Sequence, residues 1–387
     1  MSGLISFSQG LSNISNNVAN LNTPGYKRTQ LEFLDLYYRY SYSGSSDQQA
    51  SPYSQGSGVK TGASLMNFSD GEFRQTGNDL DLAVKGNGFF VLRKDGETLY
   101  TRAGQFEVDD NGFLAAKDDG ARVAGFSGGG LKDISVSGKR SNPAQATRNV
   151  AFVNTLSTSS TTFSVPDISV FDSLGVEHKL TLNMTNDSAT TPGRWTLTVL
   201  ENATTLTTGE VRYSGSGAPL AGFDTVSFSY SPGGGAATNT VTLDFTGSTY
   251  FSSSSSTLSV GTRDGYAAGY LTKTTVDDSG NVVLHYSNGQ TVKDSRLALA
   301  WFSNLSALQA QGSNRYVVFG DTEKLVGNPN DNGLGKIQSG GIELSNVDLA
   351  QEFSELIIVQ RGYQASSQVI SAANEMIQQL GEIRGRK

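Results

Sequence analysis

The sequence predicts a multidomain protein that combines an α-helical terminal coiled-coil domain, with paired N- and C-terminal helices, and two mainly antiparallel β domains inserted in nested fashion. Three observations predict this fold class. Apolar residues recur at steps of three and four near both chain ends, as in a helical seam. Between the ends, short apolar runs alternate with Gly, Asn and Asp turn signals. A central block alternates apolar and polar residues with a period of two, which is typical of strands with one buried face.

Residues 3 to about 22 are expected to form the first helix, which the Pro24-Gly25 turn signal ends. Its apolar residues follow each other at steps of 3, 4, 3, 4 and 3 and form the first half of a predicted assembly seam: Leu4, Phe7, Leu11, Ile14, Val18 and Leu21. No residue from 1 to 26 is charged, and the flanks carry Ser, Asn and Gln. Such flanks tolerate several partners and registers, whereas charge pairs would select one. An ordinary surface helix is the alternative.

The C-terminal helix is expected to begin at a capping box formed by Ser345 and Asp348. One apolar stripe consists of Ile358, Gly362, Ala365, Val369, Ala372 and Met376. A flanking stripe consists of Leu349, Phe353, Leu356, Tyr363, Ile370 and Ile377. The second half of the predicted assembly seam is drawn from both stripes: Phe353, Leu356, Ile358, Val369, Ile370 and Met376.

The region between the two helices is assigned by its turn chemistry and alternation. Residues 31–68 are expected to be an extended connector that includes a Tyr/Ser/Gly-rich segment. Residues 69–148 and 263–343 are expected to form a middle β domain, and residues 149–262 an outer β domain with the period-two strands. Residues 1–30 and 344–387 complete the inner helical domain.

The N-terminal helix is expected to be unstable alone. Burying its six seam residues yields about 9–18 kcal/mol at 1.5–3 kcal/mol each. Ordering about twenty residues costs about 20–40 kcal/mol of backbone entropy, which hydrogen bonds offset only in part. We therefore expect both termini to be disordered in the monomer and to fold on assembly.

Composition excludes several classes of function. The net charge is −7 with no Lys/Arg block, which argues against nucleic acid as a partner. The absence of cysteine excludes disulfides and thiolate chemistry. No apolar run approaches the length of a membrane span, and no apolar segment with a preceding basic region suggests a cleavable secretory signal.

No catalytic, cofactor-binding or metal site is predicted. Gly86-Asn87-Gly88 lacks the third glycine of a nucleotide loop and is interpreted as a turn. Asp79 and Asp81 are interpreted as a solvated pair on an exposed hairpin, and neither His178 nor His285 has a nucleophile nearby in sequence. An extracellular carbohydrate-binding β protein is the alternative from another class. A glycoside hydrolase would need a carboxylate pair that nothing in the sequence singles out.

Four segments in order resemble the bacterial flagellar rod and hook family: "ANLNTPGYKR", "LAVKGNGFFVL", "TRAGQFEVDDNGFL" and "SNVDLAQEFSELIIVQRGYQASSQVI". A fifth, "ISVFDSLGVEHKLTLNM", is similar to the domain inserted in hook members of the family, and the chain length also favours hook over rod. A distal or proximal rod protein is the alternative within the family.

The resemblance implies a structural subunit and not an enzyme. Such a subunit polymerises with copies of itself into a flexible hollow tube that transmits motor torque from rod to filament and forms part of the export channel. It implies an extracellular location in the hook or basal body, reached by export without a cleavable signal. The implied partners are the flagellar distal rod protein, the hook cap, the hook–filament junction proteins and the flagellar type III export apparatus.

Overall fold

The computed structural model describes residues 2–36, 38–41, 53–56 and 58–384. Part of the Tyr/Ser/Gly-rich connector segment and the last residues of the basic C-terminal tip therefore lie outside the described residues. The chain divides into two compact units. Unit 1 comprises residues 1–137, 274–283 and 293–387, and unit 2 comprises residues 138–273 and 284–292.

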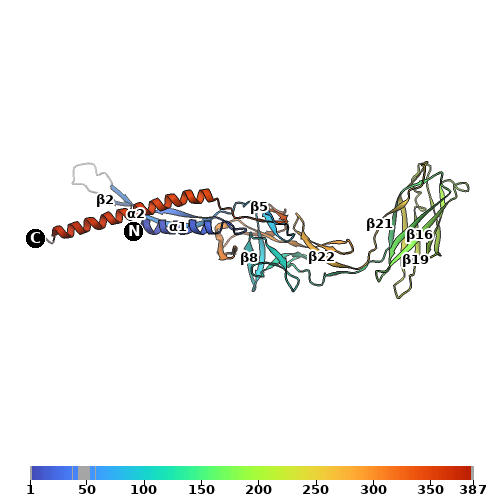
Figure 1. Ribbon diagram of the computed structural model, residues 1–387, viewed down its shortest axis with the longest axis horizontal. Coiled ribbons are helices and arrows are strands. Elements are labelled where there is room, and N and C mark those ends of the chain that lie inside the picture. Colours follow the sequence, from blue (N-terminus) through green and yellow to red (C-terminus); the bar gives the residue numbers. More distant parts are fainter. Residues whose placement is uncertain (1, 37, 42–52, 57, 385–387) are drawn as a thin grey trace. The chain divides into compact units, whose positions relative to one another are not determined.

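Both terminal segments of unit 1 are helical, and a β hairpin accompanies them (Figure 1). These elements are α1 (Ser2–Ala19), α2 (Leu349–Arg384), β1 (Thr29–Asp35) and β4 (Val59–Met66), with β2 (Tyr38–Ser41) and β3 (Tyr53–Gly56) further along the hairpin. Strands β1 and β4 pair antiparallel, as do β2 and β3. The expected connector thus contains paired strands on both sides of its undescribed part.

The helix boundaries differ from those expected. Helix α1 ends at Ala19 rather than near residue 22, because Asn20 and Thr23 form turns that lead into Pro24. Helix α2 begins at Leu349, where the Asp348 carboxylate accepts hydrogen bonds from the backbone N–H groups of Ala350 (2.8 Å) and Gln351 (3.2 Å). Asp348 is therefore the N-cap, and the expected capping box starting at Ser345 was wrong.

The β part of unit 1 is built from short antiparallel strands. They are β5 (Phe73–Gln75), β6 (Leu82–Lys85), β7 (Phe89–Lys94), β8 (Glu97–Thr101), β9 (Phe106–Val108), β10 (Leu114–Ala116), β11 (Arg122–Ser127), β12 (Gly130–Asp133), β25 (Leu299–Phe302), β26 (Leu308–Gly312), β27 (Arg315–Val318), β28 (Lys324–Gly327), β29 (Lys336–Ser339) and β30 (Gly341–Glu343). The short 3-10 helix η1 (Leu305–Ala307) precedes β26.

One hydrogen-bonded path runs in the order β11, β7, β8, β27, β26, and a cluster of buried aromatic and small side chains packs against it. Phe89 lies in this cluster, and its ring centroid is 6.1 Å from that of Phe302 and 5.9 Å from that of Tyr316. Strands β29 and β30 pair with β6 and β5, so that the segment just before α2 is hydrogen-bonded to unit 1.

Unit 2 is a sandwich of two four-stranded sheets around one apolar core. The strands of the sandwich are β14 (Asn149–Ser157), β15 (Thr162–Phe171), β16 (Glu177–Asn186), β17 (Arg194–Glu201), β18 (Thr204–Arg212), β19 (Thr225–Tyr230), β20 (Asn239–Phe251) and β21 (Ser259–Arg263). Strands β22 (Gly269–Val276), β23 (Asn281–Tyr286) and β24 (Thr291–Leu297) have residues in both units. The short strand β13 (Ser141–Asn142) also lies in unit 2 but pairs with β22. The core includes the fully buried Trp195 and the stacked pair Phe152 and Phe245.

Strands β14 and β20 pair parallel, whereas the alternation pattern was interpreted as an antiparallel sandwich or barrel. A period of two shows which face of a strand is buried but carries no information on strand direction. Among the described residues, no helix has the length and hydrophobicity required to cross a lipid bilayer.

Candidate assembly surface

Helices α1 and α2 pack against each other in opposite directions. Gly3 lies against Ser366, Gly10 lies against Val359, and the Asn17 amide donates a hydrogen bond to the Glu352 carboxylate (3.2 Å). Residue numbers therefore rise along α1 as they fall along α2 (Figure 1).

Glycine residues allow α1 and α2 to approach each other closely. A Cβ atom added at Gly362 would lie 2.6 Å from Cζ of Phe7, which is closer than real Cβ atoms approach other atoms. A Cβ at Gly10 would lie 3.2 Å from Cγ1 of Val359 and 3.2 Å from Cζ of Phe33. Glycine is therefore required at Gly362 by packing, although it weakens a helix by about 1 kcal/mol relative to alanine.

The β1–β4 hairpin covers a second side of α1. The rings of Phe7 and Phe33 have centroids 5.8 Å apart, and Thr61 donates a hydrogen bond from Oγ1 to Gln9 (2.6 Å). Asn13 and Asn17 each donate from Nδ2 to the Thr29 carbonyl at 2.8 Å. These uncharged side chains are thus engaged within the chain, in addition to any role toward neighbouring copies.

A buried charged cluster fixes the base of the helix pair. Glu352 is fully buried and forms an ion pair with Nε of Arg28, and Nη2 of Arg28 lies 2.7 Å from Oε1 of Glu355. Burial alone would lower the pKa of Arg28, but hydrogen bonds and charge from Glu352 and Glu355 raise it above its usual value. Arg28, which lies just after α1, therefore pairs with both carboxylates at the start of α2.

A second buried cluster ties both terminal segments to the β part of unit 1. The Lys27 ammonium group, whose side chain is 0% exposed, donates to Glu343 Oε1 at 2.5 Å and to the Ser69 carbonyl at 2.7 Å. Arg102, also buried, places Nη1 3.7 Å from Oε2 of Glu343. Burial lowers the pKa of Lys27, and the charge of Glu343 only partly opposes this shift.

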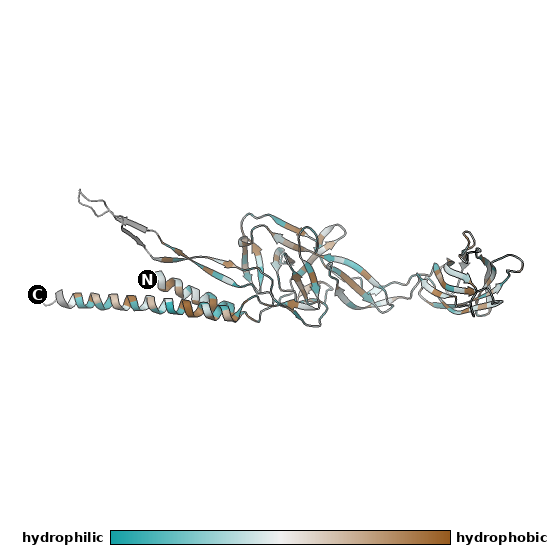
Figure 2. Cartoon of the chain, turned by 90° about the horizontal axis from the view of Figure 1, so that it is seen from above, coloured by the Kyte–Doolittle hydropathy of each residue, from teal (hydrophilic) through white to brown (hydrophobic). Residues whose placement is uncertain are grey.

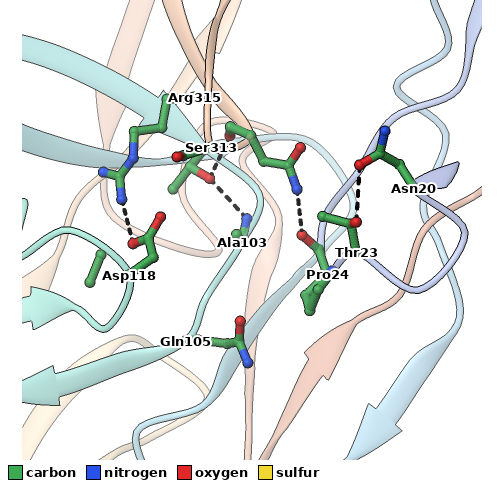
Figure 3. Close-up of a pocket in the computed structure, with 11 residues that line it drawn as sticks. Asn20, Thr23, Pro24, Ala103, Gln105, Asp118, Ser313 and Arg315 are labelled. Atoms are coloured by element: carbon green, nitrogen blue, oxygen red, sulfur yellow. Dashed lines mark hydrogen bonds and ion pairs between the residues drawn. The ribbon is translucent and has the colours of Figure 1, made fainter. Parts of the chain in front are cut away.

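The loop that leaves α1 is docked on the β26–β27 hairpin, beside a cavity of about 270 Å³ (Figure 3). Asn314 at the hairpin tip donates from Nδ2 to the Pro24 carbonyl (2.8 Å), and its own carbonyl accepts from Thr101 Oγ1 (2.8 Å). Gly25 has φ of 68°, and a Cβ there would lie 2.6 Å from the backbone nitrogen of Ala103. The Pro24-Gly25 turn therefore requires glycine for both its conformation and its packing.

The predicted seam residues fall into three groups in the single chain. Ile14 is buried. Seven are half-buried: Leu4, Phe7, Leu11, Val18 and Leu21 on α1, and Leu356 and Ile370 on α2. Four on α2 are exposed: Phe353, Ile358, Val369 and Met376. With about 100° per residue, Ile358, Val369 and Met376 share one side of α2, about a quarter turn from the side that contacts α1.

We call Ile358, Val369 and Met376 the outward stripe. The side of α2 that contacts α1 instead carries Glu352, Val359, Gly362 and Ser366. The two predicted stripes include Gly362, Ile370 and Ile377 on this side but leave out Glu352, Val359 and Ser366, because charged and small polar residues do not stand out in a search for apolar periodicity. The usable signal was a glycine on each helix within the seam and the pair Lys27-Arg28, the first charges in the chain.

Outside the helix pair, Asp81, His178 and Asp172 form ion pairs or hydrogen bonds with neighbouring side chains. Asp81 is buried and lies 3.1 Å from Nζ of Lys117, so the expectation of a solvated Asp79–Asp81 pair was wrong. In unit 2, Nδ1 of His178 lies 2.9 Å from Glu201 and Nε2 lies 3.4 Å from Asp172. Burial raises the pKa of Asp172, but the backbone N–H groups of Val176 and Leu174 and the His178 ring lower it by more, so that it lies below its usual 3.8.

Four family models match the chain in order along its length. "Flagella basal body rod protein" matches residues 1–27, and "Flagellar hook protein FlgE/F/G D1 domain" matches residues 83–153. "Flagellar basal body protein FlaE D2 domain" matches residues 139–266, and "Flagellar basal body rod FlgEFG protein C-terminal" matches residues 338–383.

Curated relatives align over nearly the whole chain. The flagellar hook protein FlgE of Borreliella burgdorferi is 28% identical, with 99% of this chain and 98% of the relative covered. FlgE of Salmonella typhimurium is 29% identical, again with 99% and 98% covered. The crystal structure of the flagellar hook protein FlgE2 of Helicobacter pylori superposes with a TM-score of 0.52 at 13% identity, covering 68% of this chain and 99% of that one, which shows a common fold.

The two helical chain ends match basal body rod families, and the β region between them matches hook and basal body domain families. This combination defines a structural protein of the bacterial flagellum, and not an enzyme. Within that class, the two relatives named above, which align over nearly their whole length, are hook proteins. These similarities support a flagellar hook protein, a structural subunit of the hook. The family prediction from the sequence motifs is confirmed.

Proposed function

We propose that this chain polymerises into a flexible hollow tube that transmits torque from the rod to the filament and surrounds an export channel. The paired helices of residues 1–30 and 344–387 form its innermost layer, and residues 31–68 connect them to the next layer. Residues 69–148 and 263–343 form the middle layer, and residues 149–262 form the outer one.

The outward stripe on α2 carries this proposal. Val369 is 70% exposed and Ile358 is 69% exposed, on a helix whose other side is already used by α1. Figure 2 shows hydrophobic segments along this helix. Apolar surface of this kind on a helix marks an interaction site, and burying each such side chain yields about 1.5–3 kcal/mol.

The surroundings of the stripe suit copies of the same chain. Helix α1 carries no charge, and the described residues of α2 beyond Arg361 include only one acidic side chain before residue 382, Glu375. A partner with the same uncharged composition avoids burying unpaired charge. Contacts between copies in a filament must also be head-to-tail, so that the assembly does not close.

The proposal extends to partners and location. At its ends the polymer would contact the flagellar distal rod protein, the hook cap and the hook–filament junction proteins. The subunit would pass through the flagellar type III export apparatus without a cleavable signal and act outside the cell.

Cells that lack this chain provide the test. Electron microscopy is expected to show a completed rod without a hook, and the gene for the intact chain should restore the hook. Ala in place of Leu11, Ile14 or Val18 should abolish polymerisation and leave the β part folded, as judged by circular dichroism. Gln368→Ala, an exposed polar change on α2, should assemble normally. Normal hooks from all three seam variants would refute the proposal.

A further inference from the structure

The side of α2 that contacts α1 continues past the end of α1. Gly3 lies against Ser366, so residues of α2 beyond about 370 have no α1 residue opposite them. At 1.5 Å per residue, the part from residue 371 to 384 extends about 21 Å further, and Figure 1 shows α2 running past the N-terminal end of α1. We call residues 370–381 the overhang.

The overhang carries apolar residues on the same side of α2 that contacts α1. Ile370, Ala373, Ile377 and Leu380 lie within about 60° of the direction of Val359, given 100° per residue. Ile377 and Leu380 are each 66% exposed. The interface that α1 covers near Val359 thus continues as an uncovered apolar surface.

An unfilled groove lies at the other end of the same helix pair. Its volume is about 300 Å³, and its lining includes Ile14 of α1, Leu31 and Phe33 of β1, and Ile358 and Val359 of α2. One charged residue, Glu355, also lines it, and that carboxylate accepts hydrogen bonds from Arg28 (2.7 Å) and from the Gln351 side chain (3.1 Å). The groove therefore presents apolar side chains and a carboxylate whose charge is already paired.

Resting on the proposed function, we propose that the overhang of one copy packs into this groove of the next copy. The overhang cannot enter its own groove, because Ile377 and Val359 are about 27 Å apart on one continuous helix. Charge does not oppose this contact: the only charged residue of the overhang, Glu375, lies about 160° around the helix from Ile377 and can face away from the groove, where Glu355 is held by Arg28.

This contact joins two different surfaces, so it is heterologous, and it builds an open filament as long as the rotation between copies does not close a ring. Copies joined in this way are displaced by about 27 Å along the helix axis, the distance between Val359 and Ile377. The side of α2 that contacts α1 within one copy thereby also contacts the α1–β1 groove of its neighbour.

The absence of cysteine from the natural chain permits a direct test. Gln30, an exposed residue that lines the groove, and Ile377 are both replaced by Cys, and the polymer is treated with a short bis-maleimide. The matched control carries Gln30→Cys with Gln379→Cys, because Gln379 is exposed on the opposite side of the same helical turn. The first pair should give a ladder of covalent oligomers, and the control should give about tenfold less product, because its thiols face apart.

A mixed polymer made from the Gln30→Cys chain and the Ile377→Cys chain should give covalent dimers only, since each copy then carries one thiol. Loss of assembly with Ile377→Cys but not with Gln379→Cys would also support the contact. Equal cross-linking of the two pairs in intact polymer would overturn it and leave the proposed function standing. Failure of the unmodified chain to polymerise would overturn both.

Discussion

Replacing Lys27 by Met tests whether the buried charged cluster holds the helix pair to the β part of unit 1. The substitution keeps the length of the side chain and removes the ammonium group that contacts Glu343 at 2.5 Å and the Ser69 carbonyl at 2.7 Å. Glu343 is 3% exposed and retains the Gly71 N–H (2.8 Å) as a hydrogen-bond donor. Among the described residues its other oxygen, Oε2, has no hydrogen-bond partner, and the Arg102 guanidinium lies 3.7 Å from it.

The expected loss in the free energy of unfolding of unit 1 is at most about 3–5 kcal/mol, the usual cost of leaving one buried charge unpaired, because Arg102 still lies 3.7 Å from Glu343. An exposed ion pair would cost about 0–1 kcal/mol, so the two cases are well separated. Adding Glu343→Gln to Lys27→Met removes the stranded charge while keeping an acceptor for the Gly71 N–H. The double variant should therefore recover a large part of the loss.

Tryptophan fluorescence during urea unfolding measures this, because the chain has two tryptophans, Trp195 in unit 2 and Trp301 in unit 1. In a Trp195→Phe background only unit 1 contributes to the signal. With a slope of about 2–3 kcal/mol per molar urea, a loss of about 3–5 kcal/mol lowers the unfolding midpoint by about 1–2.5 M. The reasoning would be refuted if Lys27→Met lowered the free energy of unfolding of unit 1 by less than about 1 kcal/mol. It would also be refuted if the double variant were less stable than Lys27→Met.

Three further predictions concern single sites. Gly362→Ala should destabilise the α1–α2 contact by about 1–3 kcal/mol through overpacking against Phe7, which outweighs a helix-propensity gain of about 1 kcal/mol. A Cβ atom added at Gly381 would have no atom within 4 Å, so Gly381→Ala should show only the gain in helix propensity. Hydrogen exchange of α1 distinguishes the two variants, because only Gly362→Ala disturbs the contact between α1 and α2. Because the pKa of Asp172 is lowered in the folded state, its stabilisation of unit 2 is complete above about pH 4 and is lost as pH falls through the folded pKa. Asp172→Asn should therefore reduce the acid dependence of Trp195 unfolding midpoints, and an unchanged dependence would count against this carboxylate. Asp348→Ala should cost about 0.5–2 kcal/mol by removing the N-cap of α2, seen as a lower helical signal at a given temperature in circular dichroism.

The sequence predicts that both termini are disordered until assembly, and the structure limits this expectation to the overhang of α2. Residues 2–19 and 349–384 are helical in the single chain, and α1 is held by α2, by the β1–β4 hairpin and by the two buried charged clusters. The sequence estimate treated α1 alone and had no means to include these contacts. Among the described residues, Ile377 and Leu380 of the overhang have no such support and are each 66% exposed, so coupled folding is now expected there. Hydrogen exchange should show rapid exchange of residues 371–381 in the monomer and protection in the polymer.

The sequence by itself determined the class of the protein and the kind of its elements. Apolar steps of three and four predicted both terminal helices, and turn residues with period-two alternation predicted the β-rich interior. Such local patterns are readable because a helix or strand repeats its geometry every few residues. The ordered motifs from "NTPGY" to "SNVDLAQEF" predicted the family.

Only the tertiary structure decided which helix sides meet and what anchors them. The contact side of α2 uses Gly362, Ser366 and the buried Glu352, and the charge of Glu352 is matched by Arg28, which is 324 residues away in sequence. The parallel pairing of β14 with β20 likewise depends on chain path rather than on local pattern. Close packing and burial of charge are set by atoms brought together from distant parts of the chain, and no local periodicity carries that information.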